Sequence, residues 1–155
     1  MPASETLAFG RPKLSDGDML ARFQMSKKRP PCSDTLGMQL IEVNQDARII
    51  RMAFELSEGF ANPTGAVQGG FIAAMLDEAM STCCIIASNV TMTAPTLEMK
   101  ISFLRPLFPG PAEVRAHIVK WGKSAAFMEA HAYRPDGDCV ATASATALPK
   151  PFKRL

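Results

Sequence analysis

The chain has 155 residues and a mass of 16.8 kDa, the size of one domain with its own hydrophobic core. Hydrophobic residues make up 47% of it and charged residues 21%, a composition that excludes an intrinsically disordered protein. The net charge of +2 gives no support for a nucleic-acid-binding protein, which usually carries a strong basic excess.

The cysteines, the histidines and the N-terminus carry no signal of metal binding or export. The four cysteines show no CxxC spacing and the two histidines stand apart, so no metal site is expected. Residues 1–12 lack a continuous apolar stretch, so a secretory signal is not expected either. These features predict a cytoplasmic protein with reduced thiols.

The first half of the chain predicts an extension followed by two strands. Residues 1–35 are interpreted as an N-terminal extension with a short helix over 15–26, since aspartates precede its apolar residues. Alternating residues then predict strands over 38–43 and 47–56, joined by a polar turn. A loop rich in Gly, Pro and Asn follows over 57–65.

Residues 67–88 predict a helix that protein covers on nearly all sides. Apolar residues recur there at helical spacing, and the opposite face is small or apolar as well. Asp77 and Glu78 are the only charges of the segment. Each would cost about 2.5–3.5 kcal/mol at the centre of a membrane span. We therefore expect a core helix and no membrane partner.

Four further strands are predicted over 96–104, 113–121, 125–133 and 139–148, where residues alternate and turn residues separate the runs. An Asp-Gly pair marks the last hairpin. Two strands, a buried helix and four strands predict an α+β fold, in which an antiparallel sheet of five or six strands wraps the long helix. The free edges of this sheet would pair with a second chain.

The window from Asn62 to Gly70, together with Asp77, contains the functional motif. It reads Asn-x2-Gly-x2-Gln-Gly-Gly, with the aspartate seven residues after the second glycine. This pattern resembles the hotdog-fold acyl-CoA thioesterases of the phenylacetate-degradation (PaaI) type, and the resemblance extends over residues 36–148. It implies a hotdog domain over 36–149, preceded by the extension and followed by a basic tail over 150–155.

The resemblance implies hydrolysis of acyl-CoA to a free acid and CoA, by a homodimer that assembles into a homotetramer with sites between subunits. No cofactor is implied. Asp77 would be the general base or the nucleophile. Gly69 and Gly70 would present N–H groups at the helix start as an oxyanion hole. Gln68 stands where many members carry His, and it cannot titrate near neutral pH.

Further polar residues complete the expected site. Ser81 shares a helix face with Asp77 and could hold the water, unless its hydroxyl bonds its own backbone. Asn62 and Gln68 could bond the thioester or the water, although Asn62 also suits a turn. The expected substrate-binding residues are Gly69, Gly65, Thr96, Arg105 and Lys123. Arg105 and Lys123 are included because CoA carries phosphate groups, which basic side chains bind.

Alternatives stay open at this stage. Glu78 lies about 100° around the helix from Asp77 and is interpreted as structural. The alternative is that Glu78, and not Asp77, is the catalytic acid. The chain could also be an acyl-CoA-binding hotdog protein with little turnover, since Gln68 replaces His. A hydratase or dehydratase acting on acyl thioesters is disfavoured, because no histidine lies near the helix. The acyl group depends on pocket shape, which sequence does not predict.

Overall fold

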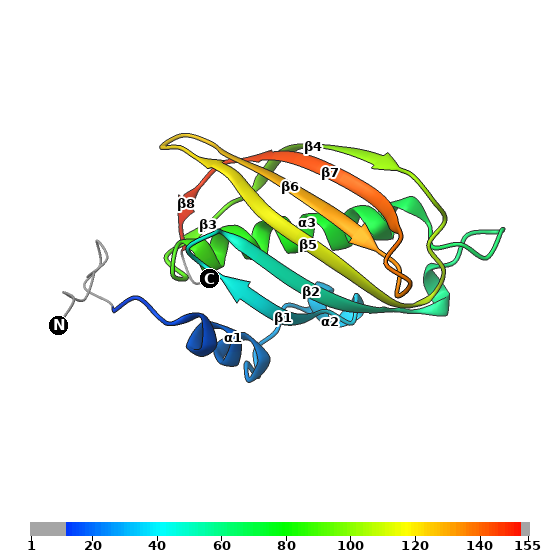
Figure 1. The fold of residues 1–155 in the computed structure, drawn as a ribbon, viewed down its shortest axis with the longest axis horizontal. Coiled ribbons are helices and arrows are strands. Elements are labelled where there is room, and N and C mark those ends of the chain that lie inside the picture. Colours follow the sequence, from blue (N-terminus) through cyan, green and yellow to red (C-terminus); the bar gives the residue numbers. More distant parts are fainter. Residues whose placement is uncertain (1–11, 153–155) are drawn as a thin grey trace.

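The computed structural model describes residues 12–152, in which one curved sheet partly encloses a long helix (Figure 1). The helical segments are α1 (Asp16–Gln24), α2 (Pro31–Thr35), the 3-10 turn η1 (Glu58–Phe60) and α3 (Gly69–Ala87). The strands are β1 (Gln39–Asn44), β2 (Ile49–Leu56), β3 (Met92–Thr93), β4 (Thr96–Phe103), β5 (Gly110–Trp121), β6 (Ala126–Tyr133), β7 (Cys139–Ala147) and β8 (Lys150–Pro151).

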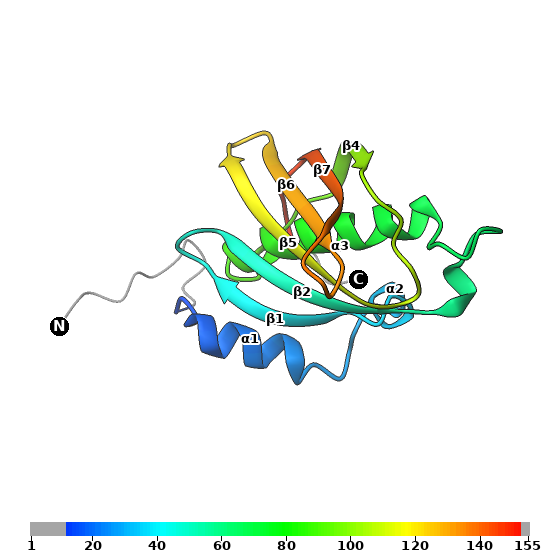
Figure 2. The same cartoon turned by 45° about the vertical axis from the view of Figure 1, so that its right-hand side comes forward.

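The main sheet has six antiparallel strands in the order β1-β2-β5-β6-β7-β4. The chain leaves β2, forms α3 and returns as β4 at the far edge, so the sheet curves around the helix (Figure 2). Val114, Ala116 and Ile118 of β5 face the helix and are buried, whereas Arg115 between them is exposed. This architecture confirms the predicted α+β hotdog arrangement, with six strands.

Small side chains bring α3 close to the sheet. β7 turns four alanines inward, and all four are buried: Ala141, Ala143, Ala145 and Ala147. Against them and their neighbours α3 packs its larger apolar side chains, which are Ile72, Met75, Leu76, Met80, Cys83 and Ile86. The core of the domain therefore lies between one side of α3 and the concave face of the sheet.

The opposite side of α3 is less covered than the sequence predicts. Phe71, Ala74, Asp77, Ser81 and Ile85 lie on one stripe of the helix and are only half-buried. We call these five residues the open stripe. The sheet encloses one side of the helix and leaves this stripe without a layer of its own. By length and composition α3 could span a membrane, but half of its residues are buried in the protein, as in a core helix.

The segment before β1 is packed onto the domain. Ser15 caps α1 by accepting the Asp18 N–H at 3.1 Å, which confirms the predicted helix. Met19 of α1 is fully buried in the core, and α1 lies along β1 (Figure 2). The Leu14 N–H donates to Asn89 Oδ1 at 3.0 Å, which ties this segment to the residues after α3. The remainder of the expected extension, residues 1–11, lies outside the described residues.

Several details differ from the predicted pattern. β1 shows a register shift between Leu40 and Glu42, so Leu40 and Val43 are the buried residues rather than a strict alternation. Helix α2 was not predicted, and neither was the two-stranded ladder of β3 with β8. Lys150 of the expected basic tail pairs with Thr93 in that ladder, and residues 153–155 lie outside the described part.

Candidate active site

Asp77 lies in the middle of α3 on the open stripe, beside the first residue of β4. Thr96 Oγ1 donates a hydrogen bond of 2.6 Å to Asp77 Oδ1. The other carboxylate oxygen of Asp77 has no hydrogen-bond partner among residues 12–152. The structure therefore brings two of the predicted site residues together, and it leaves one carboxylate oxygen available to a water molecule.

The start of α3 offers one free backbone donor. Gln68 is the N-cap, and its side-chain Oε1 accepts the Gly70 N–H at 2.8 Å. The Gly69 N–H has no acceptor within the described chain. Because the helix dipole is positive at this end, Gly69 presents a donor suited to a developing negative charge. Gln68 thus caps the helix, a role that the sequence did not indicate.

Phe103, at the end of β4, packs directly against Gly69. A Cβ atom added at Gly69 would lie 3.0 Å from Phe103 Cζ, closer than ordinary van der Waals contact. Glycine at this position therefore lets the aromatic ring approach the helix start. Phe103 was not among the predicted site residues. The alternation of β4 places its exposed side chain on the helix side of the strand, but its approach to Gly69 depends on how the strand crosses the helix.

The loop before α3 uses Asn62 and Gly65 to make a turn. Asn62 Oδ1 accepts the Thr64 N–H at 2.9 Å and the Thr64 hydroxyl at 2.7 Å. Gly65 has a φ of +84°, which favours glycine, and its N–H donates to the Asn62 carbonyl at 2.9 Å. The Asn62 side-chain nitrogen has no partner among the described residues, so it stays available to a ligand.

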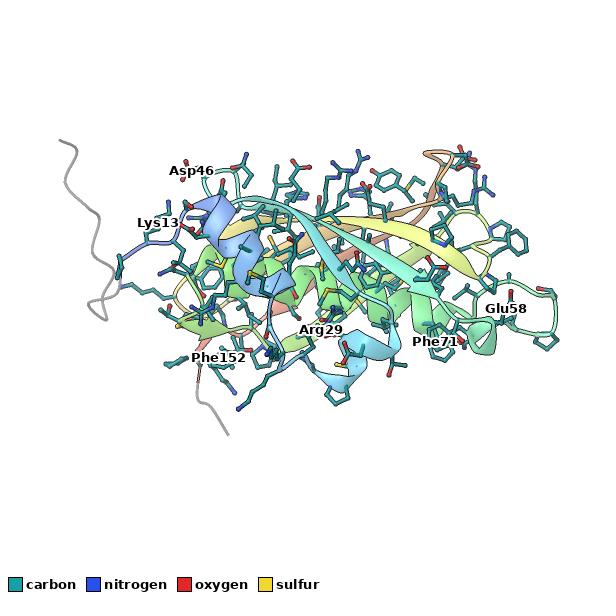
Figure 3. All side chains as sticks on the ribbon, turned by 90° about the horizontal axis from the view of Figure 1, so that it is seen from below. Lys13, Arg29, Asp46, Glu58, Phe71 and Phe152 are labelled. Carbon is teal, nitrogen blue, oxygen red and sulfur yellow. The ribbon has the colours of Figure 1, made fainter. Side chains whose placement is uncertain are left out.

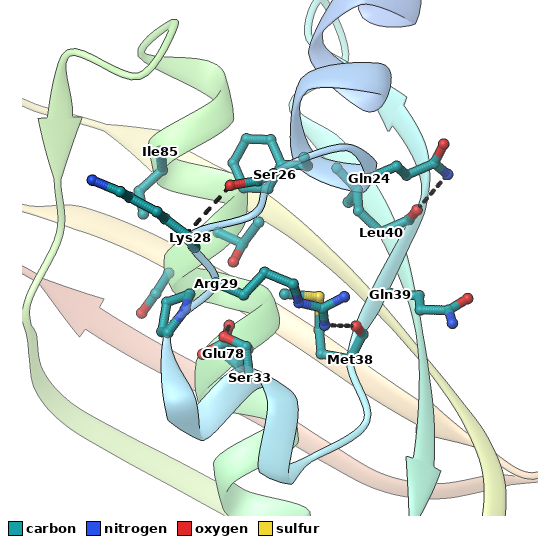
Figure 4. Close-up of a pocket in the computed structure, with 14 residues that line it drawn as sticks. Gln24, Ser26, Lys28, Arg29, Ser33, Met38, Gln39, Leu40, Glu78 and Ile85 are labelled. Carbon is teal, nitrogen blue, oxygen red and sulfur yellow. Dashed lines mark hydrogen bonds between the residues drawn. The ribbon is translucent and has the colours of Figure 1, made fainter.

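Glu78 is turned about 100° around α3 from Asp77 and lines a pocket of about 480 Å³, together with Ser81 and Ile85 of the open stripe. Ser33 of α2 is fully buried and donates a hydrogen bond of 2.6 Å to Glu78 Oε1 (Figure 4). Ser81 lines this pocket with Glu78, and its hydroxyl makes no hydrogen bond within residues 12–152. The alternative of a serine bonded to its own backbone is therefore not seen. Sequence reasoning missed Ser33, which carried no motif.

The two predicted phosphate-binding cations are not brought together. Arg105 follows β4 and donates to the Cys139 carbonyl at 3.2 Å, and it lies 3.6 Å from Asp138. Lys123 lies in the turn between β5 and β6, at the opposite end of the sheet. One chain therefore does not direct both side chains at one phosphate group. Within residues 12–152 no three His, Cys, Asp or Glu side chains converge to form a metal site.

Catalysis by one chain alone meets a geometric obstacle. Gly69 and Asp77 are eight residues apart on the same helix, about 12 Å along its axis. A carbonyl group bonded to the Gly69 N–H therefore lies too far from the Asp77 carboxylate of the same chain. If both act on one thioester, they must come from two copies of the chain.

Comparisons with known proteins agree with this fold. A family model described as the thioesterase superfamily matches residues 64–141, half of the chain. The phenylacetic acid degradation-related protein of Ralstonia eutropha JMP134 is 29% identical with a TM-score of 0.77, and the match covers 84% of this chain and 98% of that one.

Two further solved structures share the fold at lower identity. The PaaI protein of the Escherichia coli phenylacetic acid degradation operon is 19% identical with a TM-score of 0.68, over 76% of this chain and 86% of that one. A Streptococcus mutans protein solved with acetyl-CoA bound is 15% identical with a TM-score of 0.69, over 84% of this chain and 98% of that one. The chain belongs to the thioesterase superfamily and has its hotdog fold, with PaaI-type proteins among its structural neighbours.

Proposed function

We propose that the protein hydrolyses acyl-CoA thioesters to a free acid and CoA. The observation that carries the proposal is Asp77, whose carboxylate is held at one oxygen by Thr96 and open at the other, on the open stripe of α3. Membership of the thioesterase superfamily supports thioester hydrolysis. The acetyl-CoA bound to the Streptococcus mutans neighbour supports a CoA thioester as the ligand.

A second copy of the chain would complete the site. β4 is one of the two edge strands of the main sheet, opposite β1, and its apolar side chains Leu97 and Phe103 are 63% and 55% exposed. Pairing two β4 edges about a two-fold axis would extend the sheet and lay one open stripe against the other. Asp77 of one copy would then approach Gly69 of the other, which gives two equivalent sites. Further assembly into a tetramer is an expectation from the family resemblance.

The residues support general-base hydrolysis. A water molecule bonded to the free oxygen of Asp77 attacks the thioester carbonyl carbon while Asp77 takes its proton. The carbonyl oxygen becomes negative and is stabilised by the Gly69 N–H of the second copy and the dipole of α3. Collapse of this intermediate breaks the carbon–sulfur bond, and the CoA thiolate receives the proton from Asp77. The free amide nitrogen of Asn62 lies on the loop that leads into α3 and is an additional donor for the substrate.

The test is thiol release from a panel of acyl-CoA thioesters. Asp77→Asn keeps the volume of the side chain but removes the base, so we expect the rate to fall roughly 100-fold or more, with substrate binding retained. Glu129→Gln, an exposed change on the outer face of β6, is the matched control and should keep the wild-type rate. Hydrolysis by Asp77→Asn at the wild-type rate would contradict the assignment. Tight binding of acyl-CoA without thiol release by the wild type would favour an acyl-CoA-binding protein.

Mixing inactive variants tests whether two copies build the site. Gly69→Val should block the oxyanion donor, because its side chain meets Phe103. When Asp77→Asn and Gly69→Val chains are refolded together in equal amounts, half of the dimers are mixed and keep one of two sites, so activity should return to about a quarter of wild type. If Gly69 and Asp77 act within one chain, mixing restores nothing.

A further inference from the structure

We propose that the pocket beside Glu78 holds the acyl group of the substrate and that Glu78 selects acyl groups carrying a hydrogen-bond donor. This inference rests on the proposed thioesterase function. The volume of about 480 Å³ falls within the range of about 300–1,000 Å³ that is typical of sites for small ligands. Figure 4 shows the pocket between α3, the start of β1 and the chain that joins α1 to α2.

The pocket adjoins the catalytic side of α3. Ser81 lines it and also belongs to the open stripe, one helical turn after Asp77. Side chains at this spacing lie about 5–6 Å apart at their Cβ atoms. An acyl group whose thioester lies at Asp77 can therefore pass Ser81 and enter the pocket.

The pocket wall combines five apolar residues with nine polar or charged ones, Lys28 and Arg29 among them. Phe23 comes from α1, Met38 and Leu40 from the start of β1, and Ile85 from α3. They surround the space with an aromatic ring and aliphatic side chains, which suit the hydrocarbon body of an acyl group better than the polar nucleotide of CoA.

Glu78 contributes an unused carboxylate acceptor to the pocket. Ser33 donates its proton to Glu78 Oε1, and Glu78 Oε2 has no partner among residues 12–152. Arg29 also lines the pocket but directs its guanidinium elsewhere, to the Met38 carbonyl and to Asp34. Because an ionised carboxylate only accepts hydrogen bonds, its free oxygen is matched by a hydroxyl or amino group on the acyl chain. A purely apolar acyl group would leave that oxygen desolvated and unpaired.

The N-terminal segment builds part of the pocket wall. The match to the thioesterase family model begins at residue 64, whereas Phe23, Arg29 and Ser33 lie before it. Seen from below, the chain between α1 and α2 crosses the side of α3 that the sheet leaves open, with Arg29 labelled there (Figure 3). Asp77, the proposed base, thus lies inside the span of the family model, and these three residues of the pocket wall lie before it.

The test compares kcat/KM for matched substrates: hexanoyl-CoA and octanoyl-CoA, each with its ω-hydroxy derivative. The ratio within a pair is insensitive to stability and to the fraction of active enzyme. We expect the wild type to prefer the hydroxylated member of at least one pair by roughly tenfold or more, the scale of one hydrogen bond to a buried charged group. Glu78→Gln should reduce this preference, since a neutral acceptor bonds more weakly.

The double variant Ser33→Ala with Glu78→Met is the decisive measurement. It replaces both hydrogen-bonding partners by apolar groups, so the domain should stay folded while the preference for the hydroxyl group disappears. Glu129→Gln again serves as the control and should keep the wild-type ratio. An unchanged ratio in the double variant would overturn the inference while leaving the proposed hydrolysis intact.

Two other results would also overturn it. If Glu78→Gln changes the oligomeric mass by light scattering and leaves the ratio unchanged, the pocket serves contact with the second copy and not the acyl group. If the wild type hydrolyses none of the four thioesters or any other acyl-CoA, the proposed function itself fails and this inference fails with it.

Discussion

The contribution of the N-terminal segment to stability can be measured with one methionine. Met19 of α1 is fully buried and belongs to the core, so Met19→Ala removes three heavy atoms from a packed site. Such changes cost about 2–5 kcal/mol, and we expect about 3 kcal/mol here. With a urea dependence of about 2 kcal/mol per molar, the unfolding midpoint should fall by about 1.5 M.

The same segment supplies a matched control. Met25, the residue that ends α1, is 79% exposed, so Met25→Ala should change the free energy of unfolding by less than about 0.5 kcal/mol. Equal small shifts for the two variants would refute the reasoning. In that case α1 would not belong to the cooperative unit, and the interpretation of residues 1–35 as a separate extension would hold. Urea unfolding followed by circular dichroism distinguishes the two outcomes.

Two further predictions concern thiol reactivity and acid stability. Burial raises the pKa of Cys83 and of Cys84 to about 12, so a thiol-specific reagent at neutral pH should label the exposed Cys32 long before either, until urea unfolds the domain. The hydrogen bonds from Arg51 lower the pKa of Glu113, so their contribution to stability is present above the unfolded-state pKa of that carboxyl and is lost as pH falls through the folded-state value. Arg51→Met should therefore destabilise the domain near neutral pH, and the difference from wild type in urea midpoint should shrink in acid.

The strands and the long helix could be predicted because their burial follows from local periodicity. In β5, Val114, Ala116 and Ile118 are buried and point to one face, which is the alternation that the sequence shows. The contact between Asp77 and Thr96 could not be predicted in this way. Asp77 was predicted as an acid on a helix face, but the family resemblance alone pointed to Thr96, and only the crossing of β4 over α3 shows that the two side chains meet.

What could not be predicted depends on short or unusual local structure. α2 has only five residues after Pro30, too few to show a periodic pattern in the sequence. Its orientation brings Ser33 into hydrogen-bond contact with Glu78, which lies 45 residues later in the chain. Gln68 caps α3 although glutamine is not among the preferred N-cap residues, so its sequence position suggested catalysis instead. In both cases tertiary contacts override the local preference of the residue.

The adjacent acids of α3 show how one helix can separate two tasks. A rotation of about 100° per residue turns Asp77 toward β4 and Glu78 toward α2, so neighbouring carboxylates enter different surroundings. Each is held by one hydroxyl hydrogen bond of 2.6 Å, from Thr96 and Ser33 respectively, and each keeps one oxygen free. For Asp77 the free oxygen belongs to a half-buried side chain of the open stripe, where the proposed reaction places a water molecule and the thioester. For Glu78 the free oxygen belongs to a half-buried side chain that lines the pocket, where the proposed ligand would bring a donor to it. Because the two partners come from different elements, β4 and α2, we expect a change in Ser33 or its segment to alter which acyl group is accepted without moving the proposed base.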